Sequence, residues 1–147
     1  MREPSNADER DRMKRRSILG SLLHFRRRRR VLLLDDDSSI RRLVSFVLGR
    51  AGYAVDEVLS GSDALEMLAA RHYDAILLDL MMPHEGGVTV IRKLSETDPA
   101  LLKRIVLLTA APDAVLEKYG SGIAAVIRKP FDAADLTRAV DRLTEAA

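Results

Sequence analysis

The sequence predicts an α/β protein built on a doubly wound parallel sheet with five strands and five helices. From Val31 onward, apolar runs of strand length alternate with segments whose apolar residues recur at helical spacing. The strand-length runs are almost continuously aliphatic, as expected for strands that are buried on both faces of a sheet. The connections between them are short, and the chain of 147 residues is long enough for one such domain.

Each expected strand is an aliphatic run bounded by polar or turn-forming residues. The third run ends at Asp79, the fourth ends at Thr109, and the fifth is followed by Lys129-Pro130. The five expected strands are residues 31–34, 54–58, 74–79, 104–109 and 123–127. Because strands and helices alternate, the crossovers should be right-handed and helices should cover both faces of the sheet.

Each expected helix combines apolar residues at helical spacing with a signal for its start or its end. Ser38 or Ser39 caps the first helix, which stops at Gly52. The run Ser60-Gly61-Ser62-Asp63 opens the second. The third ends before Pro99, since a residue that precedes proline disfavours helical backbone. The last two expected helices are residues 114–119, which end at Gly120, and residues 132–146.

Residues 1–30 differ in composition from the expected domain, residues 31–147. They hold eleven Lys and Arg against four acids, a net charge of +7, which leaves −5 for the rest of the chain. Such charge blocks repel themselves, and we expect a basic, flexible extension without regular structure. A second interpretation stays open. Apolar residues between the basic clusters would form one face of a short helix, so that residues 10–30 would weakly contact an anionic membrane surface or nucleic acid; these residues are Ile18, Leu19, Leu22, Leu23 and Phe25.

Composition excludes several classes of protein. The chain has no Cys, which rules out a disulfide framework and is consistent with a reducing compartment. No apolar stretch approaches the ~18 residues that a membrane span requires, and the short apolar stretch before the arginine run lacks a signal-peptide cleavage site. We therefore expect a cytoplasmic protein.

Acidic residues follow two of the expected strands directly. Asp35, Asp36 and Asp37 come after residues 31–34, and Asp79 comes at the end of the third strand. Carboxyl ends of neighbouring parallel strands open into one crevice, so these carboxylates should meet there. Like charges this close require a cation or retained protons. With oxygen ligands and no Cys, the hard ion Mg²⁺ is favoured.

These motifs, in this order, resemble the receiver domain of two-component response regulators. The resemblance covers residues 31–147 and implies the flavodoxin-like strand order 2-1-3-4-5. The segments that carry it are Leu34-Asp35-Asp36-Asp37, Leu78-Asp79-Leu80-Met81-Met82-Pro83, Gly87, Leu108-Thr109-Ala110 and Lys129-Pro130-Phe131.

The resemblance also implies a role for each site residue. Asp79 would be the phosphoacceptor; Asp36, Asp79 and the main-chain carbonyl of Met81 would ligate Mg²⁺, with Asp35 assisting. Lys129 would supply positive charge to the phosphoryl group, and Thr109 would donate its hydroxyl to a phosphoryl oxygen. Two further features follow: a cis Lys129-Pro130 peptide bond, and Val126 at a position where receivers often carry an aromatic switch residue.

The implied function is a stand-alone receiver rather than a turnover enzyme. It would accept a phosphoryl group from a sensor histidine kinase or a histidine phosphotransferase and lose it slowly by hydrolysis. Since the chain ends with the last expected helix, we expect no direct DNA-binding domain, and signalling through contacts with a downstream protein target.

Two alternatives remain. A haloacid-dehalogenase-like phosphatase would use Asp35 as nucleophile and Asp37 as acid and base, but no acidic pair follows Lys129 to hold its metal. A receiver-shaped binding module without phosphorylation would act through its basic extension.

Overall fold

The computed structural model describes residues 6–23 and 27–145 and contains one five-stranded parallel sheet. The strand order is β2-β1-β3-β4-β5, as expected. The strands are β1 (Arg30–Leu34), β2 (Ala54–Val58), β3 (Ala75–Leu78), β4 (Ile105–Thr109) and β5 (Ala125–Arg128). This order places β1 and β3 side by side at the centre of the sheet, with β2 and β5 at its edges.

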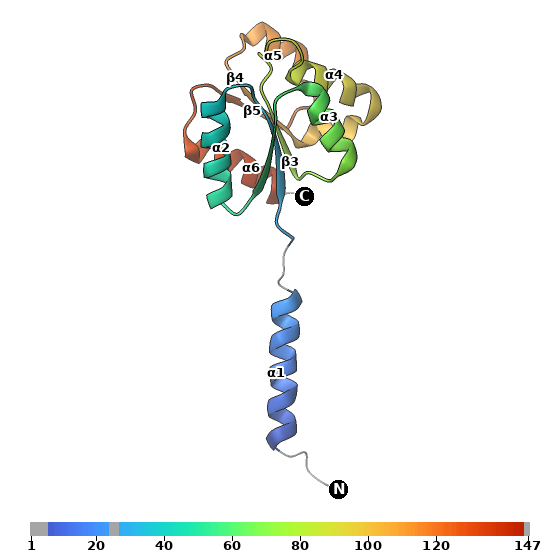
Figure 1. The fold of residues 1–147 in the computed structure, drawn as a ribbon, viewed down its shortest axis with the longest axis vertical. Helices are drawn as coiled ribbons and strands as arrows, with labels where there is room; N and C mark the ends of the chain where they lie inside the picture. The colour runs from blue at the N-terminus through green and yellow to red at the C-terminus, as the bar shows by residue number, and fades with distance from the viewer. Residues whose placement is uncertain (1–5, 24–26, 146–147) are drawn as a thin grey trace.

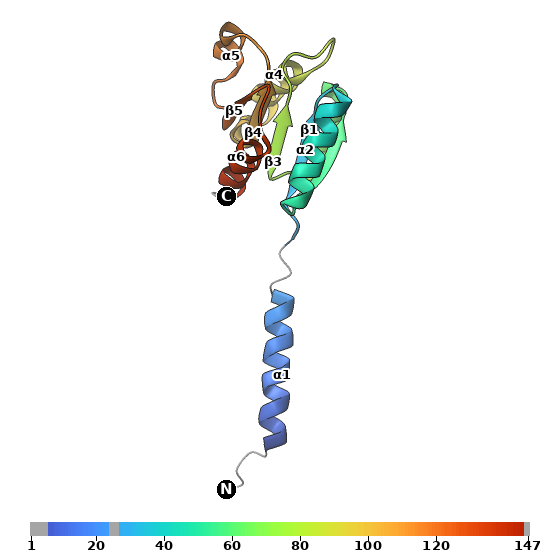
Figure 2. The ribbon, with the colours of Figure 1, turned by 90° about the vertical axis from the view of Figure 1, so that its left-hand side faces the viewer.

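Helices cover both faces of this sheet. The helices are α1 (Asn6–Leu23), α2 (Ser38–Arg50), α3 (Gly61–Ala70), α4 (Gly87–Thr97), α5 (Asp113–Tyr119) and α6 (Ala133–Glu145), and Pro99–Arg104 forms a 3₁₀ helix, η1. Helices α2 and α6 pack on one face, whereas α3, α4 and α5 pack on the other (Figures 1 and 2). The alternation of strands and helices therefore gives the doubly wound arrangement that the sequence predicts.

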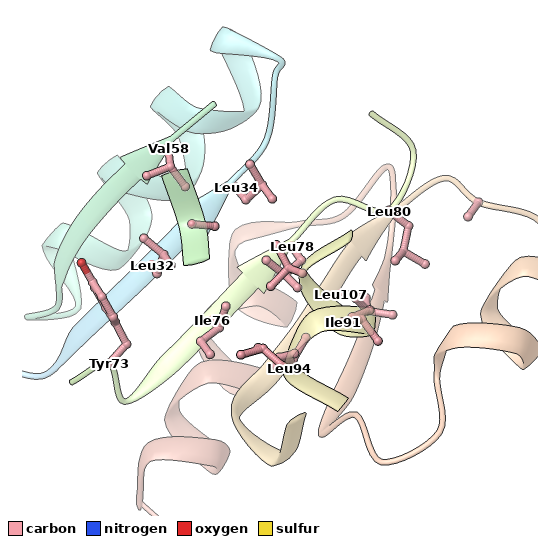
Figure 3. Packing of buried hydrophobic residues seen from close by; sticks show 14 residues of the cluster. Leu32, Leu34, Val58, Tyr73, Ile76, Leu78, Leu80, Ile91, Leu94 and Leu107 are labelled. Carbon is pink, nitrogen blue, oxygen red and sulfur yellow. The ribbon is translucent and has the colours of Figure 1, made fainter. Parts of the chain in front are cut away.

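The strands bury alternate side chains on opposite faces, which builds two aliphatic layers. Leu32 faces α3 and α4, and its neighbour Leu33 faces α2 and α6. Figure 3 shows the first layer, where Leu32, Ile76 and Leu107 come from three neighbouring strands. Each fully buried Leu or Ile side chain stabilises the fold by about 1.5–3 kcal/mol, so the layers hold the strand ends in place.

The first helix of the domain begins with a different cap from the one expected. Asp37, rather than Ser38 or Ser39, is the N-cap of α2, and its carboxylate accepts the N–H groups of Ser39 at 2.8 Å and Ile40 at 3.3 Å. An aspartate both satisfies free N–H groups and places negative charge at the positive end of the helix. Ser60 caps α3 as the sequence indicates, with its hydroxyl 3.1 Å from the N–H of Asp63.

The fifth strand lies two residues later than expected at its start. It spans Ala125–Arg128 because the parallel register pairs Val106 with Ala125 and Thr109 with Arg128, whereas Ile123 packs against the core ahead of the strand. Its side chains alternate: Ile127 is buried, while Val126 and Arg128 are exposed on the other side. The helix η1 was not predicted; Pro99 lies in its first turn.

The amino-terminal extension contains a helix. Asn6–Leu23 is the helix α1, which Figures 1 and 2 show apart from the sheet and its helices. Arg30 belongs to β1, and Arg28 and Arg29 bond to the domain: Arg28 Nη2 donates to the carbonyl oxygen of Tyr53 at 2.9 Å, and Arg29 Nη1 donates to Thr144 Oγ1 at 3.2 Å. The folded domain therefore begins before Val31, because Arg28 and Arg29 bond to Tyr53 and Thr144 of the domain.

Among the described helices, none combines the length and the apolar character that crossing a membrane requires.

Candidate functional site

The site is built at the carboxyl ends of the two central strands. Strands β1 and β3 pair in parallel with Leu34 opposite Leu78, so the next residues, Asp35 and Asp79, follow side by side. The N–H of Asp79 donates to the carbonyl oxygen of Leu34 at 2.9 Å, which continues the ladder to this point. Strand pairing, rather than nearness in sequence, brings the two carboxylates together.

Three carboxylates converge at this edge of the sheet. One oxygen from each of Asp35, Asp36 and Asp79 lies within 4.8 Å of the others. Asp35 and Asp79 are 0% and 5% exposed, whereas Asp36 is open to solvent. Three carboxylate oxygens at this spacing fit a hard divalent cation such as Mg²⁺, and the exposed member leaves a path by which the ion can enter.

Lys129 places a positive charge against the same carboxylates. Its Nζ lies 2.7 Å from Asp35 Oδ2 and 3.4 Å from Asp79 Oδ2. Burial by itself would lower the pKa of this ammonium, but the two carboxylates outweigh burial and raise the pKa above its usual value. The Lys129-Pro130 peptide bond is cis, as expected.

Backbone N–H groups orient the two buried carboxylates. Asp35 Oδ1 accepts the N–H of Asp37 at 2.9 Å, and Asp79 Oδ1 accepts the N–H of Met81 at 3.0 Å. Burial raises the pKa of Asp79, and the bonds from Met81 and Lys129 oppose this rise without cancelling it. The ionised form of Asp79 therefore depends on positive charge supplied nearby.

Gly87 allows the helix α4 to start against the backbone of Asp79. Its N–H donates to the carbonyl oxygen of Asp79 at 2.9 Å. A Cβ atom built on Gly87 would lie 2.6 Å from that same oxygen, closer than real Cβ contacts come. Glycine is thus required at the start of α4 by a close approach of two backbones.

Thr109 ends β4 next to the site and is fully buried. Its carbonyl oxygen accepts the N–H of Lys129 at 3.0 Å, and its hydroxyl oxygen accepts the N–H of Ala111 at 3.0 Å. The hydroxyl is therefore engaged with its own loop, and its backbone is tied to the residue that carries the ammonium.

The structure brings Asp35, Asp36, Asp79 and Lys129 into one cluster. Met81 joins it through its backbone N–H, whereas its side chain is 56% exposed. The sequence gives no sign of two further contacts. Arg41 Nη1 donates to the carbonyl oxygen of Asp35 at 3.0 Å, and Arg128 Nη1 donates to the carbonyl oxygen of Ala111 in the loop after Thr109. Neither arginine stands in a motif, and each contact depends on the packing of its element.

The strand order and this pocket define a class: doubly wound α/β domains with a cluster of carboxylates opposite a lysine at the carboxyl edge of the sheet. Comparison with known proteins makes the class specific. The family model of the response regulator receiver domain matches residues 31–141.

Individual relatives and structures agree with that match. The transcriptional regulatory protein ResD of Bacillus subtilis is 34% identical over 110 residues, covering 74% of this chain and 45% of ResD. The transcriptional regulatory protein DltR of Streptococcus agalactiae is 34% identical over 100 residues, covering 67% of this chain and 44% of DltR. A sensor protein from Polaromonas sp. JS666 superposes with a TM-score of 0.71 at 31% identity, covering 82% of this chain and 98% of that one.

The chain belongs to the response regulator receiver family of two-component systems. It spans less than half the length of the curated relatives it matches. Receiver domains are generally signalling modules without substrate turnover. The family match also sets aside the haloacid-dehalogenase-like phosphatase that the sequence left open.

Proposed function

We propose that this receiver accepts a phosphoryl group on Asp79 from a phosphohistidine of a sensor histidine kinase or a histidine phosphotransferase. The observation that carries the proposal is the position of Asp79: its carboxylate is nearly buried, oriented by the backbone N–H of Met81, and contacted by the ammonium of Lys129. An oriented carboxylate with adjacent positive charge is what attack on an anionic phosphoryl group requires.

The transfer forms one bond and breaks another. An oxygen of Asp79 bonds to phosphorus as the bond from phosphorus to the donor's imidazole nitrogen breaks, and the imidazole keeps the electron pair and takes a proton from water. Lys129 opposes the repulsion between the two anions, because a unit charge at 4 Å contributes about 4 kcal/mol at an effective dielectric constant of 20. The raised pKa of Lys129 keeps its charge in place through neutral pH.

The carboxylates of the site fit Mg²⁺ as a cofactor. Asp36, Asp79 and the main-chain carbonyl of Met81 would hold the ion, and Asp35 would assist them. The ion, when bound, supplies further positive charge to the phosphoryl oxygens. Asp35 is already held by Lys129 and by the N–H of Asp37, so it contributes negative charge without needing to move.

Thr109 and Val126 bear on the response to phosphorylation. The hydroxyl of Thr109 would donate to a phosphoryl oxygen once that oxygen is present. Val126 lies on the exposed side of β5 and is 42% exposed, so no aromatic ring follows the hydroxyl inward at this position. The signal would then pass to a downstream protein through the surface around β4 and β5.

Mass spectrometry of the intact protein tests the proposal. With Mg²⁺ and acetyl phosphate, the wild type should gain the mass of one phosphoryl group, and Asp79→Asn should gain none. Asp98→Asn, an exposed position at the end of α4, is the matched control and should behave as the wild type. A mass gain in Asp79→Asn, or none in the wild type, would contradict the proposal.

A second candidate function concerns the amino-terminal extension. Residues 7–18 of α1 are all exposed; they include Met13 at 73%, Ile18 at 59%, and five basic residues, Arg10, Arg12, Lys14, Arg15 and Arg16. The five basic residues outnumber the three acidic residues of this exposed stretch, Asp8, Glu9 and Asp11, and a net positive helix suits an anionic lipid surface, where arginines meet the headgroups.

Cosedimentation tests this second function. The whole chain should bind vesicles that contain phosphatidylglycerol and should not bind phosphatidylcholine vesicles, and Ile18→Asp should weaken the binding. Arg138→Gln, on the exposed side of α6, removes one positive charge elsewhere and is the control. Equal binding by Ile18→Asp and the wild type, or preference for duplex DNA over vesicles, would contradict a lipid contact.

A further inference from the structure

The loop that joins β4 to α5 is held from both of its sides. On the inner side, the N–H of Ala111 donates to Thr109 Oγ1 at 3.0 Å. On the outer side, Arg128 Nη1 donates to the carbonyl oxygen of the same residue, Ala111, at 2.7 Å. Ala111 is fully buried, so both of its backbone groups depend on these partners rather than on water.

Arg128 reaches the loop because of its place in the sheet. It pairs with Thr109 in the register of β4 and β5, and its side chain leaves β5 on the same side as Val126. Its second terminal nitrogen pairs with Asp113, the first residue of α5. One guanidinium thus bridges the middle of the loop and the start of the next helix, as its rigid fork of donors permits.

The two contacts of Arg128 differ in strength. The pair with Asp113 is open to water, since the side chains are 49% and 86% exposed, and such pairs contribute little. The bond to Ala111 joins a charged donor to a carbonyl oxygen of a buried residue, which is the stronger kind of bond. The carbonyl of Ala111 is therefore the main point at which Arg128 holds the loop.

We infer that Arg128 is a positioning residue, which holds the loop in the form where Thr109 Oγ1 accepts the N–H of Ala111. This inference rests on the proposed function of Asp79. Because the N–H of Ala111 bonds to Thr109 Oγ1, any rotation of the Thr109 side chain toward a phosphoryl group requires this bond to break or the loop to move with it. Arg128 opposes both changes, and its side chain therefore sets how readily the domain responds to phosphorylation.

A measurement on the unmodified protein tests the hold on the loop. In Arg128→Gln the amide of Ala111 should exchange with solvent about fivefold faster, as expected for one lost charge-assisted bond that is partly exposed. Arg128→Lys keeps the charge with one donor group and should lie between this variant and the wild type. Arg138→Gln breaks a comparable exposed pair with Asp135 and should leave Ala111 unchanged. Equal exchange in Arg128→Gln and Arg138→Gln would overturn the inference.

A second measurement tests the effect on the site. Beryllofluoride with Mg²⁺ mimics the phosphoryl group, and it should bind Arg128→Gln about fivefold more tightly than the wild type, because less free energy is required to release the loop. Unchanged or weaker binding would overturn the inference. Failure of the wild type to bind beryllofluoride would instead count against the proposed function, and amide exchange at Ala111 still decides whether Arg128 holds the loop.

Discussion

Lys129 and Asp35 are joined by a contact of 2.7 Å between Nζ and Oδ2, although 94 residues separate them in the chain. Their side chains are 18% and 1% exposed, so the pair lies largely out of water. Removing one member of a buried pair leaves the other as an uncompensated buried charge, which costs more than the pair itself contributes. The lysine that we propose to favour phosphoryl transfer therefore also stabilises the fold.

Replacing Lys129 by Met should lower the free energy of unfolding by about 3 kcal/mol at pH 7 in buffer without divalent cations. The physical reason is the charge that Asp35 and Asp79 would retain without a partner. Urea denaturation measures the change. Lys103→Met, at an exposed position of η1, is the control and should shift stability by less than about 0.5 kcal/mol. Equal losses in both variants would show that the pair does not stabilise the domain.

Asp36→Asn should separate cation binding from stability. The carboxylate of Asp36 faces solvent but lies with Asp35 and Asp79 in the cluster. Loss of its charge should weaken Mg²⁺ binding by about tenfold, while the midpoint of urea denaturation in cation-free buffer stays nearly unchanged. Isothermal titration calorimetry measures the affinity, with Asp98→Asn as the control. Unaltered Mg²⁺ affinity would remove Asp36 from the ligand set.

Gly87→Ala should destabilise the protein by about 2 kcal/mol, since its Cβ atom would overlap the carbonyl oxygen of Asp79 and push α4 away. Gly49, inside α2, offers a control for which the expected change in stability has the opposite sign. Nothing lies within 4 Å of a Cβ built there, so Gly49→Ala should stabilise the helix by about 0.5–1 kcal/mol. Thermal denaturation of both variants checks the contrast. A neutral Gly87→Ala would mean that the contact with Asp79 is not tight.

Asp74 should make stability depend on acid pH. Burial acts to raise the pKa of this carboxyl, but the bonds from the N–H of Arg30 at 2.7 Å and from His72 outweigh it, so the pKa is lowered. A lowered pKa in the folded state stabilises the fold above the unfolded-state value of 3.8, and this stabilisation disappears as pH falls through the folded-state value.

Asp74→Asn should therefore be less stable than the wild type at pH 7, and the difference should shrink steadily below about pH 4. Urea denaturation at several pH values measures the difference. A difference that stays constant from pH 7 to pH 3 would show that the charge of Asp74 does not act on folding.

The fold and the acidic cluster could be predicted because both depend on strong local signals. Aliphatic runs marked the strands, and acids placed directly after two of them could only meet at one edge of a parallel sheet. The start of β5 was misplaced because the run from Ile123 to Ile127 is apolar throughout, and only pairing with β4 shows where the strand begins. The contacts of Arg128 and Arg41 were missed for a related reason: an arginine in sequence does not reveal which distant carbonyl its guanidinium will reach.

The bonds that Arg28 and Arg29 make with Tyr53 and Thr144 bear on how shortened proteins should be prepared. A shortened protein designed from the motifs alone would start at Val31 and would lack both guanidinium groups, and with them the bonds to Tyr53 and Thr144. A cleavage site or purification tag placed ahead of residue 27 keeps them. A starting residue after Arg29 would therefore impair yield and solubility, although the acidic cluster and Lys129 would all remain in the shortened chain.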